Sequence, residues 1–333
     1  MNPTHHTSLN WGILGPGKIA RSFARDLALV AGNRLLAVGS RSADKAAEFA
    51  LEFHVPRTYA TYEALLADPE LDIVYIATPH DSHEYWSLRA MEAGKHVLCE
   101  KPAAVNAVQL ARMTSCARER GVFFMEALWS RFNPSIMEVI RRVSSGDIGT
   151  IQYIHADFSI YRDPPADHRL VNPHLAGGAL LDLGIYPVFL AVSLLGTPED
   201  IRASAQLHPS GVDAQTVATL HYKEAVVQLM CGIRSQSDMR ARIYGTGGSF
   251  FLEPVWHETQ SYTWLNLADG SSTHYPRPTL GKGYSYEIME CMSCVRAGLQ
   301  ESPLWSWENS RAVISILDEI RRQTGVIYPF EKP

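Results

Sequence analysis

A glycine-rich turn near the start of the chain is the feature that most constrains its fold. The apolar stretch Trp11 to Leu14 reads as a short buried strand, and the turn Gly15-x-Gly17-x-x-Ala20 follows it. Gly15 allows a tight turn, Gly17 lets a pyrophosphate approach the backbone, and Ala20 lets the next helix lie close to the strand. Apolar residues then continue at helical spacing. The pattern predicts a dinucleotide-binding strand–helix unit whose helix N-terminus faces the phosphates, with the binding residues Gly15, Gly17, Lys18 and Ile19.

The second predicted strand, 34–40, ends without an acidic residue. In units that prefer NAD, an Asp or Glu near this point binds the ribose 2′-hydroxyl. Here the chain reads Gly39-Ser40-Arg41-Ser42, and a hydroxyl followed by a guanidinium suits a 2′-phosphate. We therefore expect NADP rather than NAD, held by Ser40 and Arg41. The alternative is an exposed arginine in a loop.

Predicted strands and helices alternate at short intervals from about residue 9 to 126. The further strands are 71–77, 95–99 and 122–125, and the helices after the first are 44–54, 62–66, 82–93 and 106–120. This order predicts an α/β fold, with a Rossmann-type doubly wound parallel sheet in a dinucleotide-binding domain of residues 1–126.

The pattern changes in residues 127–333. A long strand at 150–161 lies between helices at 135–144 and 179–195, and helices at 284–299 and 308–323 end the chain. Between them, strands follow one another without helices, at 201–207, 214–222, 225–233, 241–244 and 249–253. Consecutive strands indicate an open, mainly antiparallel sheet. We predict a second, α+β domain in residues 127–333.

Composition excludes several classes of protein. The net charge of −5 gives no reason to expect nucleic acid or an anionic membrane as a partner. No apolar run reaches transmembrane length, and the first ten residues lack the apolar core of a signal peptide. We therefore expect a cytoplasmic protein whose five cysteines are reduced thiols. Cys291 and Cys294 form a C-x-x-C without a second pair, and no H-x-x-x-H appears, so no metal site is predicted.

Polar residues follow two of the predicted parallel strands at the sheet edge where ligands bind. Glu100-Lys101-Pro102 comes directly after the strand 95–99, and Thr78-Pro79-His80 with His83 comes after the strand 71–77. A lysine at this edge would exchange a proton with a substrate hydroxyl or hold a reacting oxygen. We expect Thr78, Pro79, His80, His83, Glu100 and Lys101 to contact the cofactor. Alternatively, the tripeptide is a surface turn and His83 is a helix-start residue with a bonded side chain.

A second candidate group lies in the apolar segment that begins at Gly177. Asp182 and Tyr186 are four residues apart, so they share one face of a helix. Tyr186 would donate and accept the proton of a carbinol oxygen beside a cationic Lys101, and Asp182 would orient the substrate or tune Lys101. The alternative is a buried tyrosine with a satisfied hydroxyl and a surface aspartate.

Further substrate contacts are predicted at the start of the second domain and in the loop after its first strand. Trp129, Arg131 and Phe132 would form the floor of a substrate site, and Arg162 lies in a loop that would cover it. The aromatic residues are equally compatible with an ordinary core.

Taken in order, these motifs resemble the Gfo/Idh/MocA family of oxidoreductases. The matching features are the glycine turn, Thr78-Pro79 followed by His83, Glu100-Lys101-Pro102, and the Gly-Gly-Ala-Leu-Leu-Asp-Leu-Gly segment. Three further segments resemble one branch of the family, the dimeric dihydrodiol dehydrogenases and NADP-linked D-xylose dehydrogenases. These segments are 125–132, 181–186 and 284–287. This branch has a tyrosine at the position of Tyr186, where many other members of the family have a histidine.

The resemblance implies NADP-linked hydride transfer to or from a carbinol carbon of a sugar or vicinal diol. It also implies catalytic roles for Lys101 and Tyr186, and a C-terminal domain that binds the substrate and pairs subunits into a homodimer through its sheet. Two enzyme alternatives keep the fold, namely a sugar 1-dehydrogenase that makes a lactone and a reductase of a ketosugar or dicarbonyl. The alternative from another class is a non-catalytic NADP-binding regulator, which would need neither residue.

Overall fold

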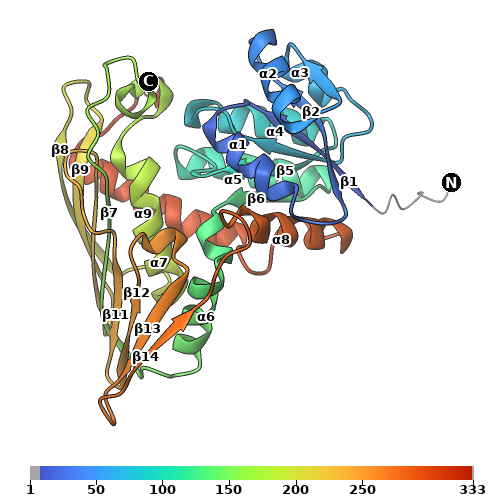
Figure 1. The fold of residues 1–333 in the computed structure, drawn as a ribbon. Coiled ribbons are helices and arrows are strands. Elements are labelled where there is room, and N and C mark those ends of the chain that lie inside the picture. The colour runs from blue at the N-terminus through green and yellow to red at the C-terminus, as the bar shows by residue number, and fades with distance from the viewer. Residues whose placement is uncertain (1–7, 332–333) are drawn as a thin grey trace. The chain divides into compact units, whose positions relative to one another are not determined.

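The computed structural model describes residues 8–331, and its contacts divide them into two compact units (Figure 1). The first unit contains the described residues up to Ala104, then Val108–Trp129 and Leu280–Trp307. The second contains Val105–Ala107, Ser130–Thr279 and the described residues from Glu308 onward. This grouping differs from the prediction of a single domain boundary after residue 126, because the segment Leu280–Trp307 belongs to the first unit.

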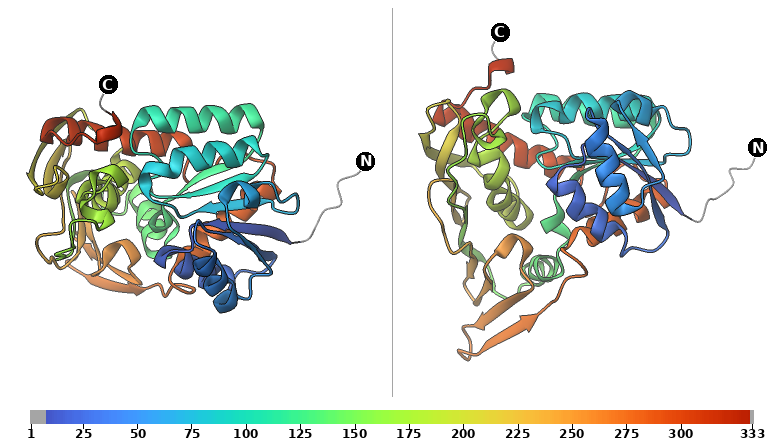
Figure 2. Two further views of the ribbon diagram at one scale, coloured as in Figure 1. Left: turned by 90° about the horizontal axis from the view of Figure 1, so that it is seen from above. Right: turned by 45° about the horizontal axis from the view of Figure 1, so that its top comes forward.

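The first unit is built on a six-stranded parallel sheet with the order β3-β2-β1-β4-β5-β6. Its strands are β1 (Leu9–Leu14), β2 (Asn33–Gly39), β3 (Arg57–Tyr59), β4 (Ile73–Ile76), β5 (His96–Glu100) and β6 (Phe124–Ala127). Its helices up to β6 are α1 (Lys18–Leu27), α2 (Ala43–Phe53), α3 (Tyr62–Leu66), α4 (His83–Glu92) and α5 (Ala107–Arg120). Helices cover both faces of the sheet (Figure 2). This is the predicted Rossmann arrangement, and the strand order reverses between β1 and β4, where such folds bind their ligands.

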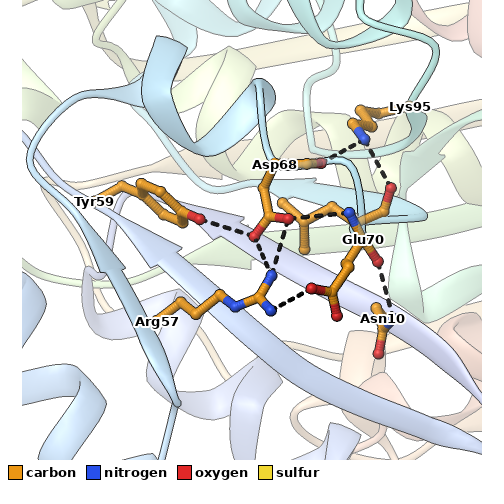
Figure 3. Close-up of polar contacts among 7 residues, drawn as sticks. Asn10, Arg57, Tyr59, Asp68, Glu70 and Lys95 are labelled. Carbon is orange, nitrogen blue, oxygen red and sulfur yellow. Dashed lines mark hydrogen bonds and ion pairs between the residues drawn. The ribbon is translucent and has the colours of Figure 1, made fainter.

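The edge strand β3 was not predicted, because three residues carry no periodic signal. Polar contacts hold it in place (Figure 3). Arg57 makes two hydrogen bonds to the Asp68 carboxylate at 2.9 and 2.8 Å, and the Tyr59 hydroxyl donates to the same group at 2.8 Å. Lys95 donates to the Asp68 carbonyl oxygen at 2.7 Å. The loop before β4 therefore fixes the edge of the sheet.

Helix α8 (Tyr284–Arg296) belongs to the first unit because Asp26 of α1 caps it. The Asp26 carboxylate accepts hydrogen bonds from the backbone N–H groups of Lys282, Gly283 and Tyr284 at 2.8–2.9 Å. A carboxylate at a helix N-terminus satisfies orphan donors and complements the helix dipole. One buried side chain thus brings residues 280–307 back to the first domain.

The second unit is built on an eight-stranded sheet with the order β14-β13-β12-β11-β7-β10-β9-β8. Its strands are β7 (Ile151–Ser159), β8 (Asp200–Leu207), β9 (Asp213–His221), β10 (Val226–Gly232), β11 (Ala241–Gly245), β12 (Gly248–Leu252), β13 (Ser261–Asn266) and β14 (Ser272–Pro276). All neighbours pair antiparallel except β7 and β10, which are parallel. The predicted mainly antiparallel sheet is confirmed, with β13 and β14 as additional strands.

Helices α6 (Pro134–Ser144) and α7 (Ile185–Leu195) pack against this sheet, and α9 (Trp307–Thr324) lies on the same side as α7 (Figure 1). Near the end of α9, Gln323 exchanges hydrogen bonds of 2.9 and 2.8 Å with the backbone of the edge strand β8. The helical run Pro173–Leu195 is long and apolar enough to cross a membrane, but 83% of its most apolar window is buried inside the protein, as in a core helix.

Candidate active site

The glycine turn after β1 forms an open cradle at the carboxyl edge of the parallel sheet. Gly15 has φ +90°, and a Cβ there would lie 2.8 Å from the Ala77 carbonyl oxygen after β4. A Cβ on Gly17 would meet no atom within 4 Å, so this face of the turn is open. Helix α1 begins at Lys18 without a side-chain cap or an acidic residue in its first turn. Its N–H groups are therefore offered to an anion.

The end of β2 exposes Arg41 and uses Ser40 to shape the turn. Ser40 is buried, and its hydroxyl accepts a hydrogen bond of 3.1 Å from the Ser42 backbone N–H. The Arg41 side chain is exposed, and its charge acts on Tyr62. Burial raises the pKa of Tyr62, and the Arg41 guanidinium partly offsets that rise. The structure thus shows a structural use for Ser40 and leaves Arg41 as the accessible cation of this turn.

Asp81 is an acidic neighbour of Arg41 that sequence reasoning missed. It follows β4 rather than β2, in the single-turn helix His80–Ser82. Burial raises the pKa of Asp81, and the charge of Arg41 acts in the opposite direction. The chain lacks the acidic residue that NAD-preferring units have at the end of β2. The carboxyl group of Asp81, from another loop, nevertheless lies within electrostatic reach of the Arg41 guanidinium. Only the fold could show this, because 40 residues separate the two in sequence.

The segment after β4 is braced against the turn after β5. His83 is fully buried, and its two ring nitrogens lie 2.8 Å from the carbonyl oxygens of Thr78 and Pro102. The Ser82 hydroxyl bonds the Thr78 hydroxyl at 3.0 Å, and His80 is buried beside His83 with ring centroids 5.6 Å apart. His83 is therefore a helix-start residue with a hydrogen-bonded side chain, which was the alternative interpretation of this residue. Pro79 and Thr78 form the turn that this brace holds.

Lys101 follows β5 directly, at the same edge of the sheet. It is half-buried, and its peptide bond to Pro102 is cis. The Tyr75 hydroxyl donates a hydrogen bond to Glu100 from the centre of the sheet. Glu126 of β6 accepts a hydrogen bond of 2.9 Å from the Ala103 backbone N–H. Two neighbouring strands therefore fix the turn that presents the lysine.

A second acid lies beneath this turn and was not assigned a role from sequence. Glu287 of α8 is fully buried, and neither of its carboxyl oxygens has a hydrogen-bond partner among the described residues. Burial, reinforced by the charges of Glu100 and Asp26, raises the pKa of Glu287 well above its ordinary value. An isolated buried carboxylate is unfavourable, so this environment favours the protonated form of Glu287.

In the second unit, Asp182 lies on an irregular helix. Residues Leu180–Gly184 form a π-helix that continues into α7, whereas the sequence pattern predicted one regular helix. Asp182 is buried, and the Arg169 guanidinium lies 3.2 Å from its carboxylate. The surface aspartate considered as the alternative is therefore excluded. π-Helical turns are rare and occur frequently at functional sites.

Tyr186, the second residue of α7, is buried among aromatic rings. Its ring centroid lies 5.4 Å from Phe158 of β7 and 4.8 Å from His257. His257 stacks on Phe158 at 4.1 Å. Sequence reasoning did not single out His257, because a lone histidine 71 positions later gives no signal. The second unit thus brings Asp182, Tyr186 and His257 onto neighbouring elements.

The remaining candidates have different environments. Trp129 stacks on Tyr284 at a centroid distance of 4.6 Å, and Phe132 is buried, so both have the packing of core residues. Arg131 is half-buried, and Arg162 is exposed in the loop after β7, where its backbone N–H bonds the Ile233 carbonyl at 2.8 Å. Within residues 8–331, no group of three or more His, Cys, Asp or Glu side chains is arranged to hold a metal ion.

Two family models match the chain, one for each half of the fold. Residues 9–128 match the Gfo/Idh/MocA oxidoreductase model with an NAD-binding Rossmann fold. Residues 136–251 match the Gfo/Idh/MocA C-terminal domain model.

Full-length relatives give the same result. A trans-1,2-dihydrobenzene-1,2-diol dehydrogenase from Mus musculus is 37% identical to this chain, over 98% of this chain and 99% of that protein. A 3-ketoreductase from Actinomadura kijaniata, solved with NADP and TDP-benzene, has a TM-score of 0.85 and 27% identity over 95% of this chain and 98% of its own. An aldose-aldose oxidoreductase from Caulobacter crescentus has a TM-score of 0.87 and 25% identity over 96% and 98%.

Proposed function

Because the chain belongs to the Gfo/Idh/MocA oxidoreductase family, we propose that it is an NADP-dependent dehydrogenase of a sugar or a vicinal, trans-dihydrodiol substrate. The main support for the proposal is the open glycine turn after β1, found in a chain that is similar over its whole length to a dihydrodiol dehydrogenase. The nicotinamide cofactor supplies hydride exchange with the carbinol carbon when it is bound. The protein supplies binding, orientation and the movement of the hydroxyl proton.

The first unit holds the cofactor in this proposal. The open turn at Gly15 and Gly17, with the uncapped N-terminus of α1 at Lys18 and Ile19, suits a pyrophosphate. Exposed Arg41 suits the 2′-phosphate of NADP, because its guanidinium is a fixed fork of donors. The turns carrying Thr78, His80 and Glu100 line the nicotinamide end, and His83 braces them.

The proton of the substrate hydroxyl is assigned to Tyr186 and Lys101. In reduction the Tyr186 hydroxyl donates its proton to the carbonyl oxygen and becomes a phenolate, and in oxidation the phenolate accepts the carbinol proton. The Lys101 ammonium stabilises the phenolate in both directions. Asp182, paired with Arg169, orients the substrate. Arg131 and Arg162 are the remaining proposed substrate contacts, while the packing of Trp129 and Phe132 favours a supporting role.

A spectrophotometric screen tests the proposal directly. Purified protein is mixed with NADP or NAD and a panel of sugars and trans-diols, and absorbance at the reduced-nicotinamide band is followed. Turnover of a diol or sugar with NADP supports the proposal, and turnover with NAD alone contradicts the cofactor assignment. NADPH binding without turnover of any sugar, diol or dicarbonyl would favour a non-catalytic regulator.

One observation favours a second candidate reaction, the reduction of a ketosugar. The structural neighbour from Actinomadura kijaniata is a 3-ketoreductase. Both directions need the same proton donor, so the screen is repeated with NADPH and ketosugars or dicarbonyls. Faster turnover in that direction would make reduction the main activity.

We also propose a cytoplasmic homodimer formed through the open face of the eight-stranded sheet. The face of this sheet that does not pack on α6 and α7 has exposed Val217, and Tyr153 stacks there on Tyr244 at a centroid distance of 5.8 Å. All five cysteines are free thiols, as in a reducing compartment.

A further inference from the structure

We propose that Asp213 is a positioning residue that sets the register of the helix carrying Asp182 and Tyr186. The inference rests on the proposed function, because it concerns the residues assigned there to the substrate. Its starting point is the π-helical segment Leu180–Gly184, which has no side-chain cap from its own flanking residue. An irregular helix that carries reactive groups needs an external reason for its geometry.

Asp213 supplies that reason from the first residue of β9. Its Oδ2 accepts a hydrogen bond of 2.7 Å from the backbone N–H of Leu180, the first residue of the π-helix. The Thr216 hydroxyl donates to the same oxygen at 2.9 Å and fixes the carboxyl group. Asp213 is fully buried, so this is a shielded contact between a carboxyl group and a helix N-terminus. It acts as a helix cap 33 residues away in sequence.

Gly178, two residues before the π-helix, makes room for this carboxyl group. Gly178 has φ +119°, and a Cβ there would lie 2.3 Å from Asp213 Oδ1. A Cβ on Gly177 would lie 2.5 Å from the Arg169 carbonyl oxygen. Gly178 therefore lets the backbone approach Asp213, and Gly177 lets it pass close to the backbone of the preceding loop.

Two further contacts hold the same segment in place. The Tyr328 hydroxyl donates to the Gly177 carbonyl oxygen at 2.8 Å from the end of the described chain. At the other end of the π-helix, a Cβ on Gly184 would lie 2.8 Å from the Cys231 sulfur of β10. Residues outside the segment thus contact it at both ends.

The register matters because Asp182 and Tyr186 lie within and just after the π-helical turn. Conversion of that turn to an α-helix would shift the register by one residue, which is a rotation of about 100°. Asp182 and Tyr186 would then no longer keep their present relation on the helix surface. A residue that holds the first turn in place therefore acts on the rate of reaction through these two side chains.

The test compares Asp213→Ala, Asp213→Asn and a control, Asp200→Asn, whose side chain is 49% exposed on β8. Hydrogen exchange by mass spectrometry follows peptides that span residues 178–188, and steady-state kinetics use the substrate found in the screen. For Asp213→Ala we expect at least tenfold faster exchange in these peptides and at least a tenfold lower kcat, with KM and the Kd of NADPH changed by less than about twofold. Asp213→Asn retains an acceptor oxygen and should restore most of both, and the control should match the wild type.

Each outcome has a defined meaning. Unchanged exchange and kcat in folded Asp213→Ala would overturn the proposal, as would a loss of stability with normal kcat. If Asp213→Ala does not fold, the nearly isosteric Thr216→Val replaces it. A reduced kcat with faster exchange then supports the proposal, and wild-type values for both overturn it. If no substrate is turned over, the proposed function fails while exchange at residues 178–188 still decides the role of Asp213.

Discussion

The assignment of Lys101 and Tyr186 makes a prediction about coupled mutations. We expect Lys101→Met and Tyr186→Phe each to lower kcat by roughly 10²- to 10⁴-fold, since each removes a group that handles the substrate proton. NADPH binding should change little. If both act on one proton, the double variant should be scarcely slower than the worse single variant.

The control for this cycle is Lys223→Met, which removes an exposed lysine from the turn between β9 and β10. It should retain wild-type kcat. Fully multiplicative effects of Lys101→Met and Tyr186→Phe would contradict a shared role, and unchanged turnover in either variant would remove that residue from the mechanism.

Arg41 makes a separate prediction about the cofactor. Arg41→Ala should weaken NADP binding by about 10- to 100-fold and NAD binding much less, because a charge-assisted contact to the 2′-phosphate is lost. Asp81→Asn should tighten NADP binding by about two- to fivefold, since it removes a negative charge that acts on Arg41. Fluorescence titration with both cofactors measures the two ratios, with Arg202→Ala on β8 as the control. Equal losses for NADP and NAD in Arg41→Ala would exclude contact with the 2′-phosphate.

The residues that could be predicted from the sequence differ from those that could not in what determines their surroundings. The positions of Gly15, Gly17 and Lys101 at the carboxyl edge of the parallel sheet were predictable, because they depend on the local backbone and on the strand that each residue follows. Asp81 and Glu287 were not, because their environments arise from loops and helices distant in sequence. A buried acid in an amphipathic helix looks the same as an exposed one until its packing is known.

Among the secondary-structure elements, those with a long hydrophobic period were predictable and those fixed by tertiary contacts were not. The parallel strands and α7 carry continuous apolar runs. The three-residue β3 depends on Arg57 and Asp68, and the π-helix depends on Asp213. Intrinsic preference alone would make Leu180–Gly184 an α-helix, so the departure requires a partner elsewhere in the chain.

The burial of Asp213 predicts a pH dependence of stability. Burial raises the pKa of Asp213 from 3.8 to about 6, against hydrogen bonds from Thr216 and Leu180 and the charge of Arg321 that lower it. The folded state therefore binds more protons than the unfolded state between these values. The stabilisation is fully present below pH 3.8 and is lost as the pH rises through about 6. Over the whole interval this amounts to about 3 kcal/mol at most.

Urea unfolding between pH 4.5 and 7.5 tests this dependence. The free energy of unfolding of the wild type should fall with rising pH relative to that of Asp213→Asn, which cannot ionise. The difference between the wild type and Asp200→Asn should be nearly independent of pH. A constant difference between the wild type and Asp213→Asn would show that Asp213 has an ordinary pKa.

For the whole molecule, the open face of the eight-stranded sheet leads to the prediction of a dimer. Consecutive strands without helices indicated the sheet, but sequence alone could not show which face α6 and α7 cover. The uncovered face carries Val217, which is 45% exposed, together with Met230 on the neighbouring strand β10. Apolar and aromatic side chains on such a face are typical of an interface between copies of a chain. Closed symmetry would pair the same face on both subunits.

Light scattering after size exclusion should therefore give twice the chain mass of 37.0 kDa. Val217→Arg should shift the protein toward the monomer, because the dimer would bring two new positive charges into its interface. The matched control is Val108→Arg on α5, where the side chain is 64% exposed in the other unit. It should leave the mass unchanged, and circular dichroism should show both variants folded. A wild-type monomer would contradict the dimer, and a dimer unaffected by Val217→Arg would place the interface elsewhere.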